Sequence, residues 1–408
     1  MVWPVHRLIF VFFFFSGFTS LVFEVLWERS LARVFGTTSL ALSTLLTAFM
    51  SGLALGAWLA GRYAHRTRRP LLVYGLLEGG VGLYALAVGG LFDALPHVYG
   101  LMFDRLFDTP ILFAALRFLA AFVILVIPTA LMGASLPFVS QWVSRSERLF
   151  QGKVGWLYAT NTLGACAGTL SAGFLLLPRL GLTMTNHTFA ALNVMLCVIV
   201  VIADSTFLRQ TGSVDDAPEI EAAAVGRAAA AEPISAAARA LVIAGFAVLG
   251  LVSMTYQVLW TRAYVIVLGS STYSFTLILA SFLLGLGSGG ALASTFVERV
   301  RRPVAWLAAA QLGLVTLAAL TFRVLDDLPR ILMDRLRAEI GAPEEIYLFQ
   351  FLLVGALVFA PIALQGASFP LVVRTLVSDR SRAGFDVARV LTGPLVAFGI
   401  YNVVFCGW

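Results

Sequence analysis

The chain has 408 residues, of which 60% are hydrophobic and 12% are charged, and its mean hydropathy is +0.91. Soluble domains are about half apolar and a quarter charged, so this composition predicts an integral membrane protein. The net charge of +6 is a small excess, which argues against a nucleic-acid partner. Positively charged loops on the inner side of a membrane would account for it.

The cysteines and histidines are few and stand apart. Cys166, Cys197 and Cys406 all lie in apolar stretches, so they predict no disulfide framework. The four histidines have no second ligand at metal spacing. We therefore expect neither a metal nor any other cofactor.

Apolar runs long enough to cross a bilayer, about 20 helical residues each, recur along the chain. Because backbone in lipid must satisfy its own hydrogen bonds, each run predicts a helix. The sequence thus predicts an all-α polytopic membrane protein with about eleven transmembrane helices. The runs lie near 8–27, 39–60, 71–91, 111–138, 155–178, 187–207, 240–260, 272–293, 304–322, 348–374 and 391–408.

Residues 209–239 interrupt this pattern, because they contain acidic residues, Pro218, Pro233 and many alanines but no large apolar face. They are typical of a flexible connector. The predicted organisation is a six-helix repeat at 1–208, a connector at 209–239 and a second repeat with five helices at 240–408.

The two repeats share one register, because adding 233 to a residue number in the first leads to its counterpart in the second. Such a register indicates internal duplication, here with both copies oriented alike in the membrane. The visible match ends after about Asp386, so we expect the second copy to lack its last helix. Matching residues include Gly17 and Gly250, Trp27 and Trp260, Gly52 and Gly285, Gly56 and Gly289, Pro128 and Pro361, Gly133 and Gly366, and Pro137 and Pro370.

Most lysines and arginines fall in the loops on the side of the N-terminus, including the run from Arg62 to Arg69. By the positive-inside rule the N-terminus and the connector are predicted to be cytoplasmic. The segments 96–108 and 328–340 mix apolar and charged residues, and we expect them to form short helices on the outer surface.

Several phrases resemble the membrane part of bacterial spermidine synthase-like fusion proteins, a group described as major-facilitator/spermidine synthase fusions. They are the stretch from Gly17 to Arg29, the stretch 35–39, the glycine pattern from Gly52 to Arg62, the second copy from Tyr256 to Arg262, and the stretch from Tyr158 to Gly164. The resemblance implies a major-facilitator-like fold in the bacterial inner membrane and suggests polyamines as substrates. It also implies that the first, fourth, seventh and tenth helices line a central cavity.

The soluble aminopropyltransferase domain of such fusions has no counterpart here, so we expect no enzymatic activity. The only dense glycine cluster, 285–290, lies inside a predicted membrane helix. It predicts close helix packing rather than a phosphate-binding loop, which would need a preceding strand.

Two carboxylates within predicted membrane helices, Glu24 and Glu78, are candidate binding residues, because charges there are costly unless a partner or cavity receives them. Their counterparts are the amides Gln257 and Gln311. Carboxylates on one side and amides on the other suit a cationic ligand. The alternative is a structural role for both, in which Glu24 lies near the interface and is hydrated or paired with an arginine such as Arg29.

Trp27 and Trp260 are predicted at the outer helix ends, as interfacial aromatic residues or as cation–π walls beside the ligand. Ser135 and Ser368 lie in matching Gly-Ala-Ser-Xaa-Pro segments, and we include them in the candidate site. Prolines that free backbone carbonyls at matching places point to a transporter's binding region. A simple packing kink is the alternative.

These features favour a transporter that moves or binds a small cationic metabolite such as a polyamine, with the lipid bilayer as its surroundings. The alternative is a non-transporting anchor or accessory subunit of a larger membrane complex, bound to membrane or soluble partners. A solvent-connected cavity at Glu24 would favour the transporter.

Overall fold

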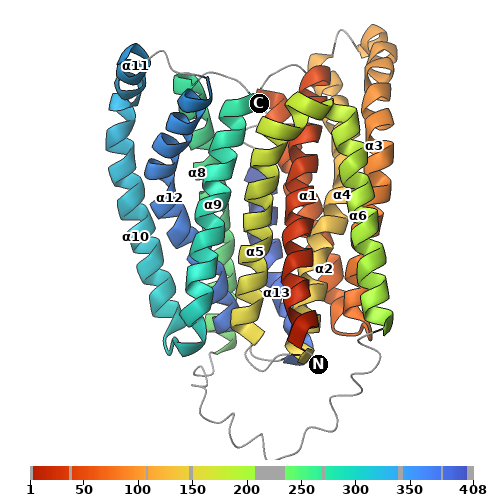
Figure 1. Cartoon of the computed structure of the whole chain (residues 1–408), viewed down its shortest axis with the longest axis vertical. Coiled ribbons are helices and arrows are strands. Elements are labelled where there is room, and N and C mark those ends of the chain that lie inside the picture. Colours follow the sequence, from red (N-terminus) through yellow and green to blue (C-terminus); the bar gives the residue numbers. More distant parts are fainter. Residues whose placement is uncertain are drawn as a thin grey trace, which may run out of the picture.

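The computed structural model describes residues 3–35, 39–106, 109–146, 150–206, 235–268, 272–338, 343–377 and 380–401. Every described element of regular structure is helical, and the long helices stand side by side along one axis (Figure 1). The first half contains α1 (Trp3–Phe35), α2 (Ser39–Ala64), α3 (Pro70–Leu106), α4 (Pro110–Ser146), α5 (Phe150–Ser171), a π-helical segment (Ala172–Leu176) and α6 (Leu177–Thr206). The second contains α8 (Ala236–Leu268), α9 (Thr272–Phe296), α10 (Pro303–Val324), α11 (Leu328–Ala338), α12 (Pro343–Leu376) and α13 (Ala383–Tyr401), with 3-10 turns at Val297–Arg299, Leu325–Asp327 and Arg380–Arg382.

Nine stretches of the described residues are long and apolar enough to cross a membrane. One of them, Gln151–Thr206, has 56 residues and holds α5, the π-helical segment and α6, and its direction breaks at Gly181 within α6, where φ is 71°. Counting α5 and α6 separately and adding α13 gives the eleven helices that the sequence predicts. The all-α polytopic fold is therefore confirmed.

Several helices begin at residues other than those predicted. α8 begins at Ala236 and α13 at Ala383, both earlier than expected. Of the predicted connector, residues 209–234 lie outside the described part of the chain. At the other side of the bundle, residues 328–340 do contain a separate short helix, α11.

The separate helix expected at 96–108 is wrong, because α3 continues through Pro96 to Leu106. The extension is held against α4: the Tyr99 hydroxyl donates to the Arg117 carbonyl oxygen at 3.3 Å, and the Arg117 guanidinium lies over the Tyr99 ring. The second half has Leu332 and Gln350 at these two positions, so it lacks this attachment.

The prolines predicted to free backbone carbonyls, Pro128 and Pro137 in α4 and Pro361 and Pro370 in α12, lie inside helices that continue on both sides of them. Pro128 cannot donate to the Ile124 carbonyl oxygen, but the Tyr84 hydroxyl of α3 donates to that oxygen at 3.0 Å. A side chain from the neighbouring helix thus replaces the missing backbone donor.

The glycines predicted to allow close helix packing do so twice, at equivalent places. In the first half a Cβ on Gly56 would overlap the Ala130 carbonyl, and one on Gly133 would overlap the Leu53 carbonyl. In the second half the same overlaps would join Gly289 to Ala363 and Gly366 to Leu286. All four pairs obey the 233-residue register, so the α2–α4 and α9–α12 crossings are copies of each other.

The register continues in space beyond the point where the sequences stop matching. Gly17 packs against the Asn161 backbone, and Gly250 packs against Pro394 at the equivalent position. α13 therefore occupies in the second half the place that α5 occupies in the first. The visible sequence match ends within the first turn of this helix, and Pro394 and Asn161 share their place against the glycine although they differ in chemistry.

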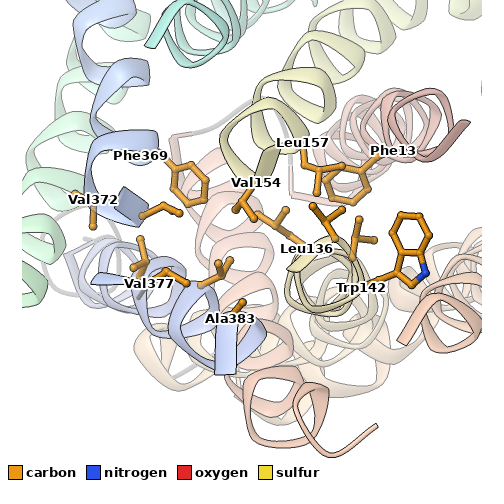
Figure 2. Packing of buried hydrophobic residues seen from close by; sticks show 14 of the residues in the cluster. Phe13, Leu136, Trp142, Val154, Leu157, Phe369, Val372, Val377 and Ala383 are labelled. Carbon is orange, nitrogen blue, oxygen red and sulfur yellow. The ribbon is translucent and has the colours of Figure 1, made fainter. Parts of the chain in front are cut away.

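The two halves meet along two seams, α5 against α9 and α2 against α13, and they share one apolar core. This core joins the starts of α1, α3, α5 and α13 to the ends of α4 and α12 (Figure 2). Because neighbouring helices alternate in direction, these segments all lie on the N-terminal side of the bundle. Towards the other side the buried residues form separate clusters, one within each half.

Candidate functional site

Glu78 is the centre of a buried polar group formed by three helices. Its carboxylate lies on α3, and the side chain is 2% exposed. Ser16 of α1 donates to Glu78 Oε1 at 2.6 Å, and Ser135 of α4 donates to the same oxygen at 3.3 Å. Two hydroxyl donors partly replace the water that an acid in the membrane loses.

The second half repeats this arrangement in neutral form. Gln311 Nε2 of α10 donates to Ser368 Oγ of α12 at 2.7 Å, and Ser368 Oγ in turn donates to the Leu364 carbonyl oxygen at 3.3 Å. Both residues are the counterparts of Glu78 and Ser135. Leu249 takes the place of Ser16, so the third member is missing.

The two sites show what each side chain can do chemically. A carboxylate only accepts hydrogen bonds, so Ser135 must direct its proton towards Glu78. A protonated Glu78 could donate to Ser135, as Gln311 does to Ser368, and the Ser135 proton could then turn to the Leu131 carbonyl oxygen at 3.5 Å. The Glu78 site can therefore accommodate a proton by turning one hydroxyl group.

The sequence pairs Glu78 with Gln311 and Ser135 with Ser368 as counterparts, and the structure brings each carboxylate or amide against its serine. Sequence reasoning missed Ser16. The register between the repeats could not identify it, because its counterpart Leu249 is apolar. A polar residue near the middle of the long apolar run of the first helix was the available signal.

Glu24 lies on α1 towards the other end of the bundle and is 4% exposed. Among the described residues, none is recorded as a hydrogen-bond donor to its carboxylate. Glu28, one turn further along α1, is a group of like charge that acts on it. The sequence offered an arginine partner for Glu24 as an alternative. Within the described residues, no arginine forms an ion pair with Glu24.

Trp27 and Trp260 are fully buried, each within its own half. Trp27 stacks on Phe23 at 5.5 Å between ring centroids, and Trp260 stacks on Phe322 of α10 at 5.2 Å. Neither ring faces lipid, as an interfacial aromatic residue would. Gln257, the counterpart of Glu24, is half-buried beside Trp260 on α8. Trp27 and Trp260 belong to separate apolar clusters, one in each half.

A second polar cluster links the two halves at the N-terminal side, and sequence reasoning missed it. Arg374 of α12 donates to Gln151 Oε1 of α5 at 2.8 Å and lies 3.8 Å from Glu298 Oε2. Glu298 Oε1 also accepts the Gly152 backbone N–H at 2.7 Å. The first turn of α5 leaves such N–H groups without helical partners, so Glu298 caps α5 from the other half.

The basic loop after α2 is tied to its own half. Arg145 of α4 donates to the Thr67 and His65 carbonyl oxygens at 2.9 and 3.2 Å. Arg69 pairs with Asp204 of α6 at 2.6 Å, which supplies an acidic partner that the loop sequence itself lacks. The loop therefore has a defined position between α2, α4 and α6.

No protein-family model matches this chain, and no curated protein sequence matches it. Solved structures do match in three dimensions, and two of them are described here. The transporter FucP of the major facilitator superfamily, in the outward conformation, has a TM-score of 0.59 and 14% identity, over 98% of this chain and 91% of its own. The proton:xylose symporter XylE, bound to 6-bromo-6-deoxy-D-glucose, has a TM-score of 0.56 and 12% identity, over 97% and 87%. At this level of identity the likeness establishes the fold, and the chain has the fold of major-facilitator transporters.

Proposed function

We propose that this protein is a secondary transporter that works by alternating movements of its two halves. The observation that carries the proposal is the combination of a major-facilitator fold over nearly the whole chain with a shared core on one side only. Packing that joins the halves at the N-terminal side and separates into two clusters at the other suits a state closed at the N-terminal side. The proposal places the protein in the bacterial inner membrane with a cytoplasmic N-terminus.

The finer part of the proposal is a small cationic solute, with polyamines suggested by the resemblance to spermidine synthase-like fusion proteins. Glu24 supports it, because no hydrogen bond to this buried carboxylate comes from the part of the chain that the structure describes, so it has bonding capacity for an ammonium group. Glu78 is already satisfied by two serines, so it supports the cation less directly and suits a proton.

Uptake of labelled spermidine by proteoliposomes tests both parts. The unmodified protein should give saturable uptake, and Glu24→Gln should reduce apparent affinity roughly tenfold to a hundredfold, because a charge-assisted hydrogen bond contributes about 1.5–3 kcal/mol. Gln257→Glu is the matched control at the counterpart position. Saturable uptake of a neutral sugar with none of spermidine would keep the transporter and remove the cation. If no solute is taken up, the transporter proposal fails.

An accessory subunit of a membrane complex is the second candidate, and one observation favours it. Only Pro303, Leu307 and Thr321 of α10 are buried, and its apolar side chains Leu312, Val315 and Leu320 are 71%, 64% and 55% exposed. An apolar helix exposed in this way offers a surface for a partner's transmembrane helix. Mild solubilisation followed by copurification distinguishes the candidates, since an accessory subunit should migrate with stoichiometric partners.

A further inference from the structure

A groove opens between α2, α8 and α13 near the N-terminal side of the bundle. Its volume is about 390 Å³, and its lining is almost entirely apolar apart from two arginines. Trp58 and Arg62 come from α2, Ile243 from α8, and Phe385 and Arg389 from α13. It lies outside the Glu78 and Glu24 sites and outside the cluster around Arg374.

The two arginines are presented in the same way from both helices. Arg62 follows Trp58 by four residues, and its guanidinium carbon lies 3.6 Å from the centre of the Trp58 ring. Arg389 follows Phe385 by four residues and lies 5.6 Å from that ring. Residues four apart share one helix face, so each aromatic ring supports the flat side of its arginine. The N–H groups at the guanidinium edges stay available to a phosphate.

Neither arginine is neutralised within the described part of the chain: no carboxylate pairs with Arg62 or Arg389. Other arginines on this side are engaged, as Arg69 is with Asp204 and Arg374 with Glu298. Trp58 is 42% exposed although it is large and apolar, and it forms one wall of the groove. An apolar groove that ends in two unneutralised guanidinium groups is complementary to a ligand with an apolar chain and an anionic head.

The internal repeat supplies a comparison within the same molecule. At the equivalent seam between α5 and α9, Ala291 and Thr295 replace Trp58 and Arg62. Gly152 and Trp156 replace Phe385 and Arg389. Both arginines are therefore absent from the equivalent face, and the groove is a feature of one seam only.

We propose that this groove, defined by Trp58, Arg62, Ile243, Phe385 and Arg389, binds one anionic phospholipid at the α2–α13 seam. The phosphate lies between the Arg62 and Arg389 guanidinium groups, and the upper part of one acyl chain fills the apolar groove below them. Basic pockets between transmembrane helices recognise anionic headgroups in this manner. Because α2 and α13 belong to different halves, the bound lipid bridges them.

Native mass spectrometry of the purified full chain tests the site, with phosphatidylglycerol or phosphatidylcholine added at equal concentration. We expect one tightly retained phosphatidylglycerol per chain, and loss of its retention by roughly tenfold or more in the Arg62→Gln/Arg389→Gln double variant. The matched control is Arg66→Gln/Arg68→Gln, which removes the same charge from exposed positions on the same side. This control should retain the lipid.

A second variant tests the chain-binding part while both arginines remain. Thr392→Trp places a large ring in the groove and should also lose the retained lipid, because Thr392 lines the groove. Equal retention of the two lipids by the unmodified protein, or equal loss in both arginine double variants, would overturn the proposal. Displacement by excess inorganic phosphate would reduce the site to an anion site without a lipid and overturn it as well. Retention by Thr392→Trp at the unmodified level would contradict an acyl chain in the groove.

Discussion

At the scale of single residues, Glu78 and its counterpart Gln311 show that the same arrangement can contain either an acid or an amide. Both side chains contact a serine at the same position of the following membrane-spanning helix, α4 for Glu78 and α12 for Gln311. Only Glu78 has a second donor, Ser16, on α1. The additional hydroxyl accompanies the residue that can carry a charge.

Replacing the acid by the amide, and the amide by the acid, should change the free energy of unfolding differently. Glu78→Gln should leave the free energy of unfolding unchanged or slightly higher, because Gln can accept from Ser16 and donate to Ser135 as Gln311 does to Ser368. Gln311→Glu should lower it by about 1–3 kcal/mol, because Leu249 offers no hydroxyl and an acid is left with one donor. Unfolding in mixed micelles measures both. Equal effects of the two substitutions would show that Ser16 has no part in holding the acid.

Tyr84 allows a second prediction at this scale. Tyr84→Phe should lower the free energy of unfolding by about 0.5–1.5 kcal/mol, since the Ile124 carbonyl oxygen then has no donor beside Pro128. In a Pro128→Ala background, a backbone N–H can bond to that oxygen, and Tyr84→Phe should cost less. A double-mutant cycle in mixed micelles gives the coupling. Additive effects would mean that the hydroxyl does not compensate for the proline.

At the scale of elements, glycines set how closely helices approach. Gly56→Ala and Gly289→Ala should each destabilise the protein by more than about 2 kcal/mol, because the added methyl group would overlap a carbonyl of the neighbouring helix. Gly89→Ala is the control: it lies within α3 with open space around it, and Ala favours a helix by up to about 1 kcal/mol. Thermal unfolding in detergent compares the three, and similar melting temperatures would contradict this account.

The presence or absence of glycines also distinguishes α3 from its counterpart α10. α6 packs closely on α3 at Gly75, Gly79 and Gly82, where added Cβ atoms would meet Val200, Cys197 and the Ala190 carbonyl. The counterparts on α10 are Ala308, Leu312 and Val315, of which Leu312 is 71% and Val315 64% exposed. A helix could not approach α10 here as closely as α6 approaches α3. The two halves thus agree in their inner crossings and differ on this outer face.

These elements also show what the sequence can and cannot predict. Apolar runs and the 233-residue register identify the helices and the paired crossings, because both follow from periodic composition. The extension of α3 was misjudged, since it depends on the contact of Tyr99 with Arg117 of α4, and a local pattern does not contain a contact between two helices. The donor that Tyr84 supplies beside Pro128 could not be predicted for the same reason. The Glu78 pair was found through the repeat, and Ser16 was missed where the repeat differs.

At the scale of the whole molecule, the contacts of Arg374 with Gln151 and Glu298 hold the halves together at the N-terminal side. Arg374→Ala should separate them there, since it leaves Glu298 without its cation. Spin labels at Arg68→Cys and Arg301→Cys, exposed positions in opposite halves, report that separation once the native cysteines are replaced by alanine. The distance distribution should move to longer values. Arg330→Ala, which removes an exposed pair with Asp334 on α11, should leave it unchanged.

The contact of Gly17 with Asn161, repeated by Gly250 with Pro394, has a consequence for how such a molecule can evolve. Both contacts hold two helices at a short distance, whereas the partner residues, Asn161 and Pro394, differ in chemistry. Selection on spacing alone leaves side chains free to diverge, so one copy of a duplicated gene segment can acquire an acid or an arginine while the other stays neutral. Asymmetric function can then arise by single substitutions within a frame that remains symmetric.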